Sequence, residues 1–134
     1  MEKILVAYDD SDEAKKALNH AKMMLDSDDE LVIAMVLPPL EDKAFARVEA
    51  DMKFNEARRL LKDLVSALND EGISARYVVK TGDVAQSILD IATDNQCKLI
   101  VIGYKGVSKI GRFSLGSVVD KVSRHADRPV LIIK

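Results

Sequence analysis

The sequence predicts one α/β domain, residues 1–134, with an open parallel sheet of five strands and four helices in three layers. Short segments that are almost entirely apolar are typical of strands covered on both faces of a parallel sheet. Between them, apolar residues recur at the three- and four-residue spacing of amphipathic helices. Because strands and helices alternate, right-handed crossovers would place helices on both faces of the sheet. A chain of this length can bury such a core without disulfides.

The five strands are predicted from short runs of apolar and β-branched residues. Nearly continuous runs predict strands at Lys3–Tyr8, Glu30–Leu37 and Lys98–Ile102. The segments Ala75–Val79 and Pro129–Ile133 have the same character and complete the set. The last strand therefore lies at the end of the sequence given.

The helices are predicted to begin at Ser11, near Asp42, at Asp83 and at Ser117. Asp10 and Glu13 are expected to form a capping box for the first helix. Gly72 is expected to end the second. The first half of that second helix, around residues 45–52, departs from the apolar register of its second half, which predicts a break or bend.

Composition argues against several classes of protein. Charged residues make up 31% of the chain with a net charge of −2, and the basic ones are interleaved with acids, so no nucleic-acid partner is predicted. No apolar run is long enough for a membrane span or a signal peptide, and we expect a cytoplasmic protein. Cys97, the single cysteine, is expected to be structural, and His20 and His125 lack partners at metal-ligand spacing. Met23, Met24, Met35 and Met52 are expected to lie in or near the core.

The stretch from Gly103 to Ser117, GYKGVSKIGRFSLGS, is the richest in glycine. It leaves the fourth strand and enters the fourth helix, where free N–H groups and the helix dipole favour an anion. Basic side chains in the same stretch are Lys105, Lys109 and Arg112. This pattern favours phosphate binding over the simpler interpretation, in which Gly116 and Ser117 only cap a helix.

Asp9 and Asp10 follow the first strand. Open α/β sheets bind ligands beyond the carboxyl ends of their strands, where the strand order reverses. If the first and fourth strands are neighbours, Asp9 and Gly103 face one crevice, and Asp9 could accept a hydrogen bond from a ribose hydroxyl. Helix capping is the alternative role for both aspartates, and for Asp9 it remains open.

The glycine spacing resembles a known family. Gly103, Gly106, Gly116 and Ser117 reproduce the G-x2-G-x9-G-(S/T) pattern of the ATP-binding branch of the universal stress protein family. The segments KILVAYDDSDEAKKAL, LVIAMVL, TGDVAQSILDIA and RPVLIIK are similar to that family's first strand and helix, second strand, third helix and last strand. The resemblance thus runs from the first strand to the last.

The resemblance implies a Rossmann-like, adenine nucleotide-binding fold with strand order 3-2-1-4-5. It implies that ATP is bound, with Mg²⁺ offsetting the negative charge that Asp10 adds where the family usually has a small residue. A homodimer through the last strand, Pro129 to Lys134, is also implied. The implied contacts are Ala7 and Val36 with the adenosine through their main chain, Asp9 and Gly103 with the ribose, and Gly106, Gly116, Ser117 and Val118 with the phosphates.

Several functions agree with these features. A nucleotide-responsive regulatory module is favoured, because no general base beyond Asp9 or Asp10 is in place and no catalytic residue is predicted. A slow Mg-dependent ATPase using the same pocket is the main alternative. A receiver-like signalling domain is disfavoured, since Lys80 and Thr81 stand where its phosphoacceptor aspartate would be. A nucleotide-free scaffold is disfavoured by the glycine pattern.

Overall fold

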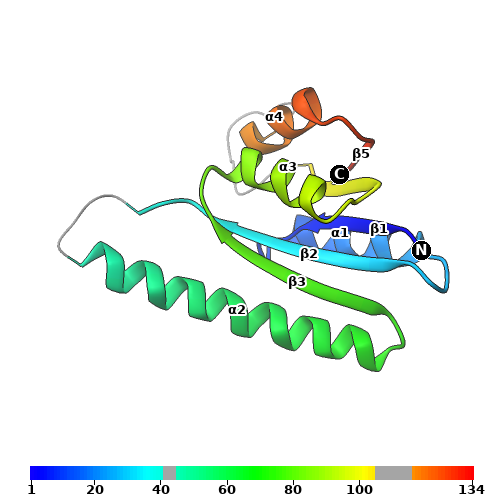
Figure 1. The fold of residues 1–134 in the computed structure, drawn as a ribbon, viewed down its shortest axis with the longest axis horizontal. Coiled ribbons are helices and arrows are strands. Elements are labelled where there is room, and N and C mark those ends of the chain that lie inside the picture. Colours follow the sequence, from blue (N-terminus) through cyan, green and yellow to red (C-terminus); the bar gives the residue numbers. More distant parts are fainter. Residues whose placement is uncertain (41–44, 105–115) are drawn as a thin grey trace.

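The computed structural model describes residues 1–40, 45–104 and 116–134. In these ranges the elements are β1 (Lys3–Ala7), α1 (Asp12–Met23), β2 (Glu30–Leu37), α2 (Ala46–Asp70), β3 (Ser74–Thr81), α3 (Val84–Asp94), β4 (Leu99–Gly103), α4 (Ser117–His125) and β5 (Val130–Ile133). The strands form one parallel sheet in the order β3-β2-β1-β4-β5 (Figure 1). The predicted fold class and strand order are confirmed.

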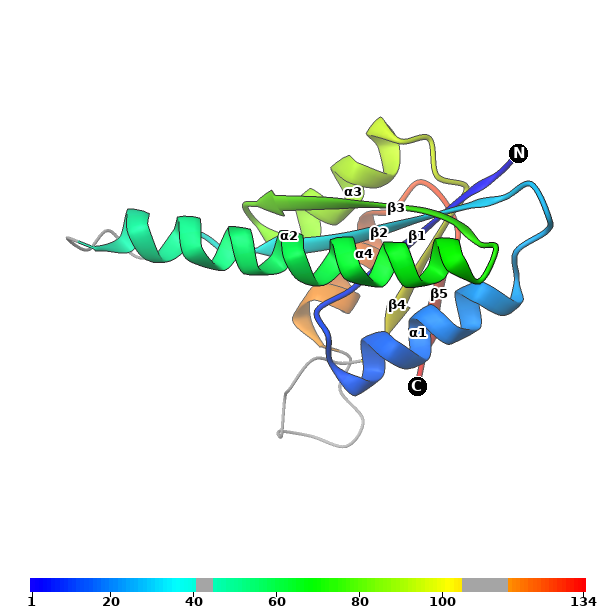
Figure 2. The ribbon, with the colours of Figure 1, turned by 90° about the horizontal axis from the view of Figure 1, so that it is seen from below.

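The sheet separates two apolar cores. Helices α1 and α2 cover one face and α3 and α4 the other, as Figure 2 shows from the α1–α2 side. In the central strand β1, Ile4 and Val6 contribute to the α1–α2 core, whereas Leu5 contributes to the α3–α4 core. Both faces of β1 are buried, which explains why the strand is continuously apolar instead of alternating.

The first helix begins differently from the prediction. Its N-cap is Ser11, whose hydroxyl oxygen accepts a hydrogen bond from the backbone N–H of Ala14 at 3.1 Å. Asp10 has a φ of 65°, in the left-handed region, and its carboxylate accepts from the Tyr8 hydroxyl at 3.0 Å. An N-cap residue needs an extended backbone, so the predicted capping box of Asp10 and Glu13 is wrong.

The second helix is unbroken from Ala46 to Asp70, so the predicted break is wrong; its predicted start near Asp42 lies outside the described residues. Its buried residues begin only at Ala57. The first turns extend past the sheet (Figures 1 and 2), and Val48 and Met52 there are exposed. Without a neighbouring layer these turns have no apolar register to keep. Of the four methionines expected in or near the core, only Met35 is buried.

The predicted starts of α3 and α4 and the predicted end of α2 agree with the structure. Asp83 caps α3, because its carboxylate accepts from the backbone N–H of Gln86 at 3.0 Å. Gly72, with a φ of 85°, follows the last turn of α2. Helix α4 begins at Ser117 after Gly116, which is its N-cap. The start of α4 is thereby brought next to the carboxyl ends of the central strands.

Candidate functional site

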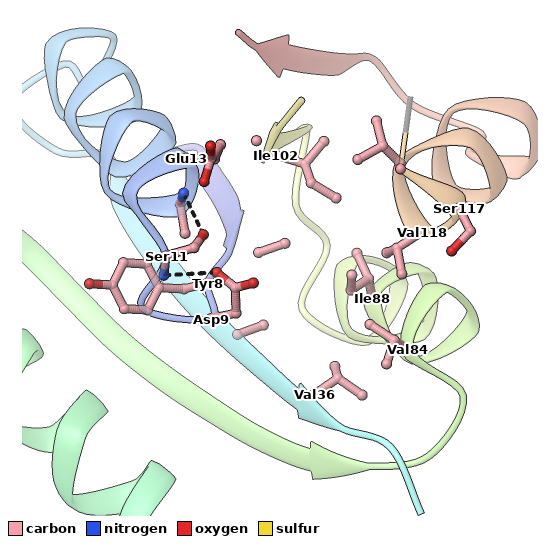
Figure 3. A pocket seen from close by; sticks show the side chains of 16 residues that line it. Tyr8, Asp9, Ser11, Glu13, Val36, Val84, Ile88, Ile102, Ser117 and Val118 are labelled. Carbon is pink, nitrogen blue, oxygen red and sulfur yellow. Dashed lines mark hydrogen bonds between the residues drawn. The ribbon is translucent and has the colours of Figure 1, made fainter. Parts of the chain in front are cut away.

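A pocket of about 320 Å³ lies beyond the carboxyl ends of β1, β2 and β4, between the start of α1 and helices α3 and α4 (Figure 3). Its lining comes from every one of these elements. The residues are Ala7, Tyr8, Asp9, Ser11, Glu13, Ala14, Ala34, Val36, Val84, Ile88, Ile102, Gly103, Gly116, Ser117, Val118 and Val119. The strand order of the sheet reverses at β1, which has β2 on one side and β4 on the other. Open α/β sheets bind ligands at such a point.

Most residues predicted for the site are brought together here. The pocket contains the predicted Ala7, Asp9, Val36, Gly103, Gly116, Ser117 and Val118. The predicted Gly106 lies outside the described residues, as do the basic side chains of Lys105, Lys109 and Arg112. Segments more than a hundred positions apart in the sequence thus meet around one cavity.

The loop between β1 and α1 holds Asp9 at the pocket. The backbone N–H of Tyr8 donates to the carbonyl of Ala34 at 2.8 Å, which continues the pairing of β1 with β2. One carboxylate oxygen of Asp9 accepts from the backbone N–H of Ser11 at 3.0 Å. Figure 3 shows both Asp9 and Ser11 at this edge of the pocket. Asp9 therefore braces the turn before the N-cap while its carboxylate lies on the pocket wall.

Tyr8 is a neutral donor in this loop. Burial raises the pKa of its hydroxyl to about 12, and the hydrogen bond to Asp10 and the charges of Asp10 and Asp9 add to this effect. A protonated phenol can donate to a carboxylate, whereas a phenolate cannot. The Tyr8–Asp10 hydrogen bond thus persists over the physiological pH range.

The backbone of Val36 faces the pocket side of β2. The carbonyl of Ala34 points toward β1, since it accepts from Tyr8, and backbone polar groups alternate sides along a strand. Those of Val36, two residues later, therefore point the same way. The pairing of β1 with β2 ends at Ala7 and Ala34, so Val36 lies beyond the last paired residue of β1. A planar ligand could accept and donate hydrogen bonds there.

Apolar side chains form the wall opposite Asp9. Val84 and Ile88 come from one face of α3, and Val118 comes from the first turn of α4 (Figure 3). Neither Val84 nor Ile88 is among the site residues predicted from the sequence, and Ile88 also belongs to the α3–α4 core. Their four-residue spacing at the start of α3 was the available signal. Such a wall suits an apolar or aromatic ring.

The start of α4 completes the pocket rim. Gly116 is the N-cap and provides no side-chain hydrogen bond to the first turn. The carbonyl of Gly116 accepts from the N–H of Asp120 at 2.9 Å, and the N–H groups before Asp120 have no partner within the helix. An anionic group of a ligand can supply the missing acceptor.

Three other features were considered from the sequence: a metal site, a reactive cysteine and a membrane-spanning helix. Among the described residues, no group of three or more His, Cys, Asp or Glu side chains could hold a metal ion. Cys97 is buried, and desolvation raises the pKa of its thiol above the ordinary value. In the described part of the chain, no helix is both long and apolar enough to cross a membrane.

The fold is that of an α/β protein with a pocket at the carboxyl edge of its parallel sheet, where such sheets bind ligands. The chain belongs to the universal stress protein family, whose model matches residues 1–134. It is 29% identical over 146 residues to the universal stress protein YxiE of Bacillus subtilis, covering 98% of each chain.

Solved structures of universal stress proteins have a fold similar to that of this chain. The structure of MJ0577, a universal stress protein of Methanocaldococcus jannaschii, has a TM-score of 0.89 and 27% identity, with 99% of this chain and 95% of that chain covered. A universal stress protein in complex with cAMP has a TM-score of 0.67 and 26% identity, with 99% and 97% covered. Neighbours in fold thus include a nucleotide complex.

Proposed function

We propose that this chain binds ATP in the pocket at the carboxyl ends of β1, β2 and β4, and acts as a nucleotide-responsive regulatory module. The observation that carries the proposal is the composition of one cavity. A carboxylate, an apolar wall, the part of β2 beyond its pairing with β1 and the N-terminus of a helix line the same space. The relative in complex with cAMP supports an adenine nucleotide as the ligand class.

Each part of the pocket would take one part of ATP. Adenine presents an acceptor beside a donor on its Watson–Crick edge, which the N–H and carbonyl of Val36 would match, while guanine presents the reverse order. Val84 and Ile88 would contact the faces of the base. Asp9 would accept from the ribose hydroxyls, beside Gly103 and the backbone of Ala7.

The phosphates would lie at the start of α4. The N–H groups of Ser117 and Val118 would donate to phosphate oxygens beside Gly116, whose own N–H donates to the carbonyl of Tyr104 at 3.4 Å, and Gly106 would complete the cradle. Asp9 and Glu13 also line the pocket, so a nucleotide polyphosphate brings further negative charge close to carboxylates. Mg²⁺ bound to the phosphates would reduce this repulsion. ATP should accordingly bind more tightly with Mg²⁺ than with a chelator present.

Calorimetric titration with ATP, using GTP as the control ligand, tests the proposal. Gly116→Val should abolish ATP binding while circular dichroism shows an intact fold, because a β-branched side chain would occupy the space of a phosphate. Ser117→Ala should weaken binding only modestly, since the main-chain donors remain. Failure of ATP to bind the parent protein, or equal ATP affinity in a folded Gly116→Val variant, would contradict the assignment.

The homodimer is proposed to form through the last strand. Among the described residues β5 pairs with β4 alone, so the outer edge of β5 is available for a second copy. Light scattering should give twice the mass of one chain. The backbone groups of Pro129 and Ile133 face β4, so by alternation the N–H of Ile132 faces the outer edge; Ile132→Pro, which removes that donor, should shift the equilibrium to monomers. A monomeric parent protein at micromolar concentration would exclude this arrangement.

A further inference from the structure

The loop that carries Asp9 is tied to the core by a neighbouring pair of side chains. Tyr8 is 6% exposed and packs in the α1–α2 core, and its hydroxyl donates to a carboxylate oxygen of Asp10 at 3.0 Å. Asp9 lies between these two residues. In Figure 3 the ring of Tyr8 and the carboxylate of Asp9 point away from each other, the carboxylate toward the pocket.

This arrangement fixes the chain on both sides of Asp9. The Tyr8 backbone is paired with Ala34, and its ring is held by the core. Asp10 has a left-handed φ of 65°, a backbone conformation that residues other than glycine seldom adopt. Its carboxylate accepts a hydrogen bond from the hydroxyl of the buried Tyr8. The peptide groups before and after Asp9 are thereby held, so the direction of its side chain is set by two anchors.

The Asp9 carboxylate accepts a hydrogen bond from the backbone N–H of Ser11, which lies in the same turn. A bond within the turn cannot fix the turn relative to the sheet. The Tyr8–Asp10 bond can, because Tyr8 belongs to the core beneath α1 and α2. The Ser11–Asp9 hydrogen bond thus shapes the turn, whereas the Tyr8–Asp10 hydrogen bond fixes the orientation of the turn relative to the sheet.

We propose that Tyr8 and Asp10 are positioning residues that aim the Asp9 carboxylate at the sugar of the bound nucleotide and so determine the selectivity of the site for ribose. The inference rests on the proposed ATP binding and adds to it the residues that decide which sugar is accepted. Asp10 is not among the residues that line the pocket, and the hydroxyl of Tyr8, which does line it, donates to Asp10. Their effect is transmitted through Asp9.

The test compares ATP with 2′,3′-dideoxy-ATP, which lacks both ribose hydroxyls. The parent protein should bind ATP at least about tenfold more tightly, since a hydrogen bond to a charged group is worth that ratio or more. Tyr8→Phe keeps the buried ring but removes the donor. It should weaken ATP binding by about three- to tenfold and leave dideoxy-ATP binding unchanged, so the selectivity ratio falls toward one.

Two matched variants separate positioning from general damage. Tyr77→Phe removes a hydroxyl from a tyrosine of β3 that packs against the same core but lies outside the loop, and it should leave the selectivity ratio unchanged. Asp10→Asn retains an oxygen that can accept from Tyr8 and should keep most of the selectivity. Asp10→Gly suits the left-handed backbone better but lacks the acceptor, and it should lose selectivity as Tyr8→Phe does.

The outcomes distinguish this inference from the proposed function. If the parent protein bound neither nucleotide, the ATP assignment itself would fail. If the parent showed the ribose preference and Asp9→Ala lost it, while Tyr8→Phe and Asp10→Gly kept it, ATP binding would stand and the positioning role would be overturned. An equal loss of affinity for both nucleotides in Tyr8→Phe would also overturn it, because that pattern indicates a distorted pocket.

Discussion

A β-carbon added to Gly103 would lie 2.9 Å from the Cβ of Glu13 and 3.1 Å from its backbone carbonyl atoms. The first turn of α1 thus packs directly on the end of β4. Gly103→Ala should lower the free energy of unfolding by about 1–3 kcal/mol, because backbone on both sides must shift to admit a methyl group. Urea titration followed by circular dichroism measures the change.

The same substitution at Gly72 is the control for Gly103→Ala. Its φ of 85° strains an alanine, but an added β-carbon there meets no atom within 4 Å. Gly72→Ala should therefore lower stability by about 1 kcal/mol without affecting nucleotide binding. Gly103→Ala should weaken binding as well, since Gly103 and Glu13 both line the pocket. If Gly103→Ala had the same free energy of unfolding as the parent protein, the contact between Gly103 and Glu13 would be able to admit a methyl group without cost.

Gln96 is a position where glycine should stabilise the protein. It follows the last turn of α3 with a φ of 55°, while the next N–H, of Cys97, donates to the carbonyl of Ala92 at 2.9 Å. This is the helix ending that glycine favours. Gln96→Gly should raise the free energy of unfolding by about 0.5–1 kcal/mol. Gln86→Gly, within the same helix, should lower it by about 1 kcal/mol. A loss of stability in Gln96→Gly would contradict the reasoning.

Arg128 holds the turn between α3 and β4 from the start of β5. Its guanidinium donates to the carbonyls of Ala92 and Cys97 at 2.8 and 2.6 Å and to the hydroxyl of Thr93 at 3.1 Å. Arg128→Lys cannot reproduce this fork and should lower the free energy of unfolding by about 1–3 kcal/mol. Arg124→Lys, which alters an exposed pair with Asp120 on α4, should have little effect on the melting temperature.

Asp29 should make stability depend on pH in acid. It is buried, and hydrogen bonds from the backbone N–H groups of Asp26 and Glu2 hold the pKa of its carboxyl below the ordinary value. A folded pKa below the unfolded one means that the stabilisation is complete above about pH 4 and is lost as pH falls through the folded value.

Asp29→Asn measures that contribution. An amide has one oxygen, so one of the two N–H donors would face its NH₂ group. The variant should be less stable than the parent at neutral pH, and the gap should close in acid as the parent carboxyl becomes protonated. Asp28→Asn, at an exposed neighbour, is the control. A gap that stayed constant with pH would show that the charge of Asp29 is not responsible.

The sequence predicted the sheet well because its signals are physical and local. A strand such as β2 must be apolar on both faces when helices cover both faces of the sheet. Its run of apolar residues can therefore be recognised without knowing which face each residue occupies. The position of the pocket followed from the same logic, since strand ends converge once the order is known. Asp9 and Gly103 could accordingly be placed at one pocket from the strand order alone, and both line it.

What could not be predicted depended on contacts across the chain. Asp10 resembled a helix cap in sequence, but its backbone conformation and its bond to Tyr8 leave that role to Ser11. The sequence predicts a ligand contact at Gly103, and the structure adds that a side chain there would collide with Glu13. The break predicted in α2 assumed that the whole helix lies on the sheet.

Helix α2 consequently contains two regions of different opening free energy. From Ala57 onward its apolar side chains are buried against the sheet, and their amide protons can exchange with solvent only when the helix separates from β2 and β3 or the domain unfolds. The turns before Ala57 have no such support, and a helix sustained by its own hydrogen bonds is marginal in water. Hydrogen exchange along one continuous helix should therefore change from fast to slow near Ala57, at a boundary set by where the sheet ends.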